Sequence, residues 1–243
     1  SVFPNPNVSF NAASVCQGNA TQFNNTSGVS SGTIVNWLWD LNGDSNADST
    51  SQNPTFIYAS AGTHVVSLTA ITNNNCVATY TNVINVNPLP NVSFAVNNAC
   101  QGAATQFTNN STISSGQISS YQWAFGNGSG TFQNNPAIVY SNIGTYVATL
   151  TATSNNNCVS SATQTVTIHA VPNVNFSVTT TCLNQATQFT NISNIASGNI
   201  VKYRWDFENN NTWDDSTANP TFVYPNFGSM QAKLQAISNN NCY

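Results

Sequence analysis

Residues 62–71 have the sequence Gly-Thr-His-Val-Val-Ser-Leu-Thr-Ala-Ile, in which apolar and polar side chains alternate. Alternation of this kind, bounded by turn-forming residues, is typical of a β-strand with one face on a core. The pattern starts again at Gly144 and at Gly228. Further strands are expected before it, at 34–39 and 55–58, with no helical periodicity between them. Short strands at such spacing predict an all-β sandwich.

The chain consists of three copies of one unit, with offsets of 84 and 82 residues between them. The motif Pro-Asn-Val-Ser-Phe at 6–10 returns at 90–94 and, with Asn in place of Ser, at 172–176. A period this long indicates a small domain in each copy rather than a solenoid repeat. Short joints with proline, such as 87–90, restrict the angle between neighbouring domains. The expected domains are 1–88 (with a preceding joint at 1–5), 89–170 and 171–243.

Large apolar side chains recur at fixed places in each copy. In the first copy they are Phe10, Phe23, Trp39, Tyr58 and Leu68. Because burial of such side chains is the main favourable contribution to folding, we expect them and their counterparts to form one core in each sandwich.

Charged residues are scarce: Lys, Arg, Asp and Glu number ten among 243 residues, whereas asparagine alone numbers 42. Three basic residues cannot neutralise a run of phosphates, which excludes nucleic-acid binding through a basic surface. No stretch approaches the roughly 18 consecutive apolar residues of a membrane-spanning helix, so no membrane span is expected. Low charge also removes the repulsion that keeps proteins apart, which favours self-association or contact with neighbouring copies in a polymer.

Three motifs of the first copy resemble the PKD (polycystic-kidney-disease) domain. They are Trp-Asp-Leu-Asn-Gly-Asp at 39–44, Asn-Pro-Thr-Phe-Ile-Tyr at 53–58 and Gly-Thr-His-Val-Val-Ser-Leu at 62–68, and the later copies match with losses at 123–128 and 205–210. The resemblance implies three tandem immunoglobulin-like, PKD-type β-sandwiches without catalytic activity. Such modules occur in bacterial surface and secreted proteins, including long adhesins, and beside catalytic domains of secreted hydrolases. The cysteine-bearing kind resembles secreted proteins of Bacteroidota-type bacteria.

Six cysteines fall as two per copy, separated by 60, 58 and 60 residues. No Cys-x-x-Cys pair and no histidine at ligand spacing supports zinc, so disulfides are expected, and with them an oxidising, extracellular or cell-surface location. We expect bonds within copies, because each small domain then closes itself; a count of six main strands places both cysteines at one end. The alternative joins neighbouring copies. The within-copy pairs are Cys16–Cys76, Cys100–Cys158 and Cys182–Cys242, and the between-copy pairs are Cys76–Cys100 and Cys158–Cys182.

All seven carboxylates lie in two corresponding loops, and they suggest calcium. In copy one, oxygen donors stand at every second residue, as in an EF-hand-type loop that wraps one ion. The glycine and glutamate expected at the sixth and twelfth positions of such a loop are Ser45 and Ser51. The candidate ligands are Asp40, Asn42, Asp44, Asn46 and Asp48 in copy one, and Asp206, Glu208, Asp214 and Asp215 in copy three.

Two other interpretations of these loops stay open. Asp and Asn side chains also cap their own backbone in ordinary polar turns. In addition, Asp-Ser-Thr at 48–50 and at 215–217 resembles the O-glycosylation motif of Bacteroidota-type bacteria, with Ser49 and Ser216 as acceptors.

Catalysis has little support, because the only two histidines, His64 and His169, do not occupy matching places in the copies. We expect no enzyme, but a structural or adhesive segment of a long extracellular repeat protein that forms or decorates a surface filament. A surface polysaccharide or protein is the expected partner beside further copies. The alternative is a spacer or substrate-binding accessory region of a secreted hydrolase.

Copy three has no counterpart of the alternating segment 77–87 of copy one. A sandwich without this strand exposes unpaired backbone groups and an open core. We expect the natural polypeptide to extend in both directions with further copies; donation of a strand by another subunit is the alternative.

Overall fold

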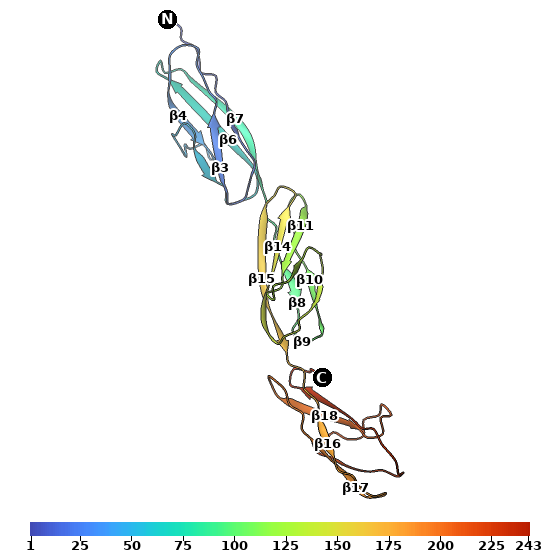
Figure 1. Ribbon diagram of the computed structural model, residues 1–243. Helices are drawn as coiled ribbons and strands as arrows, with labels where there is room; N and C mark the ends of the chain where they lie inside the picture. Colours follow the sequence, from blue (N-terminus) through green and yellow to red (C-terminus); the bar gives the residue numbers. More distant parts are fainter. The chain divides into compact units, whose positions relative to one another are not determined.

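The computed structural model describes all residues 1–243 and contains strands and turns but no helix (Figure 1). Because it has no helix, it also has none that could span a membrane. The chain divides into two compact units. The first contains Ser1–Phe94, Asn110–Gln122 and Leu150–Ala162, and the second contains Ala95–Asn109, Trp123–Thr149 and Thr163–Tyr243.

The first repeat is a sandwich of two sheets. One sheet has the order β1-β3-β5 and the other the order β2-β7-β6-β4. The elements are β1 (Phe10–Ala12), β2 (Val15–Cys16), β3 (Ala20–Asn25), β4 (Ile34–Asp40), β5 (Thr55–Ile57), β6 (Gly62–Thr72) and β7 (Val77–Asn87). The long strands β6 and β7 pair antiparallel from Gly62 opposite Val86 to Ile71 opposite Val77. The short strand β2 pairs parallel with the end of β7.

The second repeat has the same arrangement with one added two-residue strand at the edge of its larger sheet. Its sheets have the orders β13-β10-β8 and β12-β11-β14-β15-β9. The elements are β8 (Phe94–Val96), β9 (Ala99–Cys100), β10 (Ala104–Asn109), β11 (Ile118–Ala124), β12 (Gly130–Thr131), β13 (Ala137–Val139), β14 (Gly144–Ser154) and β15 (Val159–His169).

The third repeat is built on fewer strands. It has a sheet of order β16-β17-β19 and a sheet of only two strands, β18 and β20. The elements are β16 (Phe176–Val178), β17 (Ala186–Asn191), β18 (Ile200–Asp206), β19 (Thr221–Val223) and β20 (Lys233–Ser238). Whereas β6 and β14 begin at a glycine, the corresponding Gly228 lies five residues before β20 begins. Within residues 171–243, no strand corresponds to β7 or β15.

The core residues that the sequence predicts are buried. In repeat 1, Phe10, Phe23, Trp39, Tyr58 and Leu68 are all at most 5% exposed. Their rings pack mostly edge to face or tilted, as with the 5.0 Å between the ring centroids of Phe10 and Trp39. This is the geometry that aromatic quadrupoles prefer. The alternating pattern of β6 therefore places one face on an aromatic core, which confirms the prediction of an all-β sandwich.

One polar interaction inside the core recurs in all three repeats. The hydroxyl of Tyr58 donates a hydrogen bond of 2.7 Å to the backbone carbonyl of the buried Leu41. Tyr140 and Tyr224 do the same for Phe125 and Phe207. Burial raises the pKa of Tyr58 to about 12, so the hydroxyl keeps its proton and donates at neutral pH. This bond ties the Asn-Pro-x-x-x-Tyr motif to the loop that follows β4.

The substitution Tyr58→Phe is expected to lower the free energy of unfolding of repeat 1 by about 1–2 kcal/mol. The ring stays, but the buried carbonyl of Leu41 loses its partner. Chemical unfolding of the full chain measures the effect. Tyr80→Phe is the matched control, because Tyr80 packs its ring on Phe10 while the residue stays 38% exposed. Equal stability of the two variants would contradict this role of the hydroxyl.

Candidate functional site: cysteines that link neighbouring repeats

The first cysteine of a repeat lies where the last strand of that repeat ends. In repeat 1, β2 pairs with β7 so that Cys16 is opposite Asn87. The next residue, Gln17, donates its backbone N–H to the carbonyl of Asn87 at 2.8 Å. In repeat 2, Cys100 has the same place opposite His169. The first cysteine is thus held beside the joint that leads to the next repeat.

The second cysteine lies at the other end of the last strand, in the turn before it. In repeat 2 the N–H of Cys158 donates to Ser154 Oγ, and the N–H of Ser154 donates to the carbonyl of Cys158. The preceding Asn157 has a φ of 59°, in the left-handed region that asparagine tolerates better than most residues. Asn75 and Asn241 have corresponding values of 57° and 60°. The Asn-Asn-Asn-Cys motif is therefore a tight turn that presents a cysteine.

Two disulfides join these cysteines from one repeat to the next. Cys16 bonds to Cys158, and Cys100 bonds to Cys242. Each bond spans a sequence separation of 142 residues with 5.6 Å between the Cα atoms. Each also lies within one of the two compact units. In both, the first cysteine of a repeat pairs with the second cysteine of the repeat that follows.

The expected pairing within copies is therefore wrong, and so is the alternative between copies. Cys16 and Cys76 flank opposite ends of β7, which has 11 residues. A strand of that length spans roughly 35 Å, whereas a disulfide requires Cα atoms about 4.4–6.8 Å apart. None of Cys16–Cys76, Cys100–Cys158, Cys182–Cys242, Cys76–Cys100 or Cys158–Cys182 is formed.

The wrong pairing follows from the count of six main strands, which placed both cysteines of a copy at the same end of the sandwich. After β1 pairs with β3 in one sheet, the chain crosses to the other sheet and forms β2 against β7. That two-residue strand moves the first cysteine to the joint end of the repeat. Between β4 and β5 of repeat 1, the structure has an isolated bridge from Ser49 to Trp39 in place of a further strand.

Cys76 and Cys182 remain free thiols. Cys76 is half-buried, with its Sγ 3.8 Å from the carbonyl oxygen of Phe3 in the segment before repeat 1. Cys182 is exposed. The bonded Cys158 and Cys242, in contrast, are fully buried. The two free thiols are the second cysteine of repeat 1 and the first cysteine of repeat 3. Each disulfide likewise joins a first cysteine to a second cysteine.

Peptide mapping of the unreduced 243-residue chain is expected to show two linked peptides, one with Cys16 and Cys158 and one with Cys100 and Cys242. Alkylation before reduction is expected to label Cys76 and Cys182 only. A linked peptide that contains Cys16 and Cys76 would contradict the arrangement.

The carboxylates of the acidic loops accept hydrogen bonds from backbone N–H groups of the same loop. In repeat 1, Asp40 accepts hydrogen bonds from the N–H groups of Gly43 and Ser45, and Asp48 accepts one of 2.7 Å from Leu41. Backbone donation from Asn46 is the main cause that lowers the pKa of Asp44. These bonds arrange the loop as a capped turn, and the lowered pKa favours the ionised form of Asp44.

The loop of repeat 3 follows the same plan. Desolvation opposes ionisation of Asp206, but the N–H groups of Asn210 and Asn211 and the charge of Lys233 hold its pKa below the usual value. Asp214 accepts from the N–H of Phe207, as Asp48 does from Leu41. Backbone and side-chain donation from Thr217 lowers the pKa of Asp215. Glu208 accepts only from the side chain of Asn210, at 3.3 Å.

No group of three or more His, Cys, Asp or Glu side chains is gathered so as to hold a metal ion. In copy one, Asn42 and Asn46 also bond within the loop, to Asp44. Calcium binding stays a prediction, as does glycosylation of the half-buried Ser49 and the exposed Ser216.

Millimolar calcium is expected to raise the melting temperature of the full chain if the ligands of copy one rearrange around the ion, since a ligand of the native state stabilises it. Asp44→Ala is expected to abolish the rise, because it removes one carboxylate. Asp48→Ala is expected to destabilise repeat 1 even without calcium, since the buried backbone of Leu41 loses its acceptor. If calcium leaves the melting temperature of the original chain unchanged, the loop is a capped turn and not a calcium site.

Three motifs of this chain are those of a known family. They contain the tyrosine that bonds to the loop after β4, the tryptophan of the core and the glycine that begins the long strand. Two family models, both described as PKD domain, match residues 7–85 and 85–170. The chain belongs to the PKD-domain family. The resemblance read from the sequence is thereby confirmed, and repeat 3 carries the same motifs and core.

Solved PKD domains are similar in sequence to single repeats. The PKD1 domain of Vibrio anguillarum Epp is 28% identical over 34% of this chain and 95% of its own, with a TM-score of 0.32. The PKD1 domain of the Vibrio cholerae metalloprotease PrtV is 31% identical over 33% of this chain and 96% of its own, with a TM-score of 0.31. PKD domains are non-catalytic, immunoglobulin-like modules typical of extracellular proteins, and the disulfides agree with an oxidising environment.

Proposed function

We propose that this PKD-domain chain is a non-catalytic, tension-bearing segment of an extracellular repeat protein, in which disulfides fasten each repeat to the next. The observation that carries the proposal is the repetition of one bond. Cys16–Cys158 and Cys100–Cys242 join equivalent residues with the same separation of 142 residues. A bond that recurs with the repeat is a property of the array rather than of one domain.

The two disulfides limit how far the chain can be drawn out. The shortest covalent path from one end to the other runs from residue 1 to Cys16, across to Cys158, back to Cys100 and across to Cys242. This path contains about a third of the residues. At roughly 3.4 Å per residue the oxidised chain extends to roughly 260 Å, against roughly 830 Å for the reduced chain. Unfolding of the whole oxidised chain therefore releases much less length than unfolding of the reduced chain.

The surface suits a structural role beside copies of itself. The chain carries ten charged residues and a formal net charge of −4. With few charges there is little repulsion between neighbouring molecules, which supports side-by-side association in a filament on a cell surface. Adhesion to a surface polysaccharide or protein is a further part of the proposal. The alternative, an accessory region of a secreted hydrolase, has family membership as its support.

Single-molecule pulling on handles at residues 1 and 243 tests the tension-bearing role. The oxidised chain is expected to stop extending at about a third of the length reached after reduction. Replacing Cys16 and Cys158 by serine is expected to give an intermediate length, since one of the two bonds remains. The double variant Cys76→Ser, Cys182→Ser is the matched control and is expected to match the oxidised chain. An oxidised chain that extends as far as the reduced one would overturn the proposal.

A further inference from the structure

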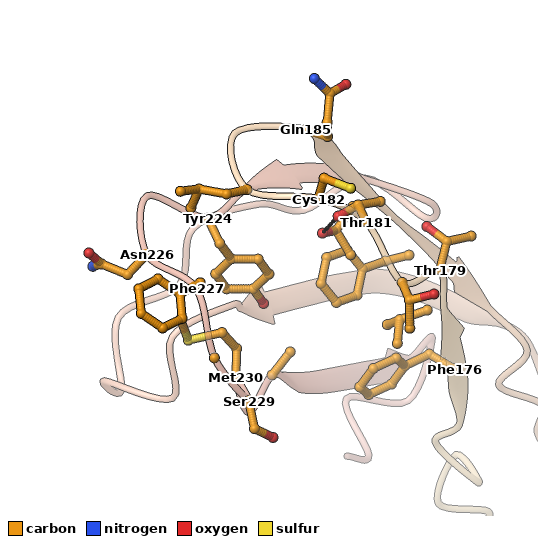
Figure 2. A pocket seen from close by; sticks show the side chains of 17 residues that line it. Phe176, Thr179, Thr181, Cys182, Gln185, Tyr224, Asn226, Phe227, Ser229 and Met230 are labelled. Atoms are coloured by element: carbon orange, nitrogen blue, oxygen red, sulfur yellow. Dashed lines mark hydrogen bonds between the residues drawn. The ribbon is translucent and has the colours of Figure 1, made fainter.

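Repeat 3 contains a pocket of about 510 Å³ that is lined by uncharged side chains. Figure 2 shows Phe176, Tyr224 and Met230 around it, with Cys182 among the residues that line it. The lining contains no carboxylate, amine or imidazole, so the pocket lacks an acid–base pair. The side chains with the clearest reactive geometry lie elsewhere, in the exposed loops that follow β4 and β11.

Two asparagines of the chain precede a glycine, and they lie in corresponding loops. Asn42 precedes Gly43 in the loop after β4, and Asn127 precedes Gly128 in the loop after β11. All four residues are exposed. A glycine has no Cβ to hinder its own backbone nitrogen, so this nitrogen can attack the side-chain amide carbon of the preceding asparagine. The two loops therefore offer the same reaction in different surroundings.

The attacking nitrogen is held in repeat 1 and free in repeat 2. The N–H of Gly43 donates a hydrogen bond of 2.7 Å to Oδ1 of Asp40. To react, this N–H must lose its proton, which the adjacent negative charge disfavours. The N–H of Gly128 has no acceptor within the chain, and residues 89–170 contain no Asp, Glu, Lys or Arg. The nitrogen that would attack Asn127 is therefore under neither restraint.

The amide carbonyl under attack is also better activated in repeat 2. Oδ1 of Asn127 accepts two hydrogen bonds from Ser129, one of 3.0 Å from its N–H and one of 2.6 Å from its hydroxyl. Two donors stabilise the negative charge that develops on this oxygen when Cγ is attacked, as in an oxyanion hole. Oδ1 of Asn42 accepts one such bond, from the N–H of Asp44. The Nδ2 of Asn42 donates to the carboxylates of Asp44 and Asp48 at 3.2 Å each, which makes its Cγ less electrophilic.

We propose that Asn127 is a site of spontaneous deamidation, whereas the acidic loop of repeat 1 protects Asn42 from the same reaction. The nitrogen of Gly128 gives its proton to hydroxide and bonds to Cγ of Asn127; the bond from Cγ to Nδ2 breaks, and Nδ2 takes a proton from water and leaves as ammonia. Water then opens the resulting succinimide ring to aspartate or isoaspartate. Because repeat 2 has no Asp, Glu, Lys or Arg, the product is its first charged side chain of these types. The inference does not rest on the tension-bearing role.

Incubation of the oxidised full chain at mildly alkaline pH with a calcium chelator tests the proposal, with peptide mapping by mass spectrometry over time. Asn127 is expected to convert at least about tenfold faster than Asn42, the factor that corresponds to breaking one hydrogen bond to a charged group. The chemically denatured chain is the reference, and its two sites are expected to convert at similar rates. Equal rates in the folded chain, faster conversion of Asn42, or an unchanged Asn127 while the denatured chain converts would overturn the proposal.

Two variants test the contacts on which the difference depends. Ser129→Ala, at an exposed residue, removes the hydroxyl donor and is expected to slow conversion of Asn127 roughly fivefold, as for the loss of one neutral hydrogen bond. Asp40→Asn removes the charge beside Gly43 and is expected to speed conversion of Asn42, while Asn127 in the same chain keeps its rate as the internal control. If Asn42 keeps its original rate in Asp40→Asn, or Asn127 keeps its original rate in Ser129→Ala, the loop contacts do not set the reactivity and the proposal is overturned.

Discussion

The parallel pairing of β2 with the end of β7 is the constraint on which the arrangement of the repeats depends. The two residues of β2 join the second sheet instead of the first, and this pairing holds Cys16 beside the joint. The antiparallel turn before β7 then places the other cysteine one strand length away. The two cysteines of such a repeat flank opposite ends of its last strand and do not reach each other. In repeat 2, Cys100 therefore bonds to repeat 3 and Cys158 bonds to repeat 1.

Much of the fold could be predicted from the sequence. The alternation in 62–71, the recurring Trp39 and Tyr58, and the positions of the motifs identified the sandwich, its core and its family. The disulfide partners could not be predicted in this way, since Val15-Cys16 is too short to show a period. A strand of two residues is defined by its partner, and the partner Asn87 is distant in sequence. The equal spacing of cysteines was visible, but spacing alone does not say at which end of a strand a residue lies.

The last strand has two roles in the sandwich. In repeats 1 and 2 it completes the core with two β-branched side chains and gives the first cysteine its backbone partner. Core completion and positioning of the first cysteine therefore depend on the same few residues, 84–87 in repeat 1, which couples the folding of these two repeats to their disulfides.

The overlap of the two closed loops has a consequence for resistance to proteases. The loop from Cys16 to Cys158 and the loop from Cys100 to Cys242 share the residues between Cys100 and Cys158. A protease that cuts one peptide bond anywhere between residues 16 and 242 leaves both fragments connected through at least one disulfide. Between Cys100 and Cys158, both bonds bridge the cut. The same staggered bonds keep the oxidised chain in one piece after a single cleavage, wherever within these loops it falls.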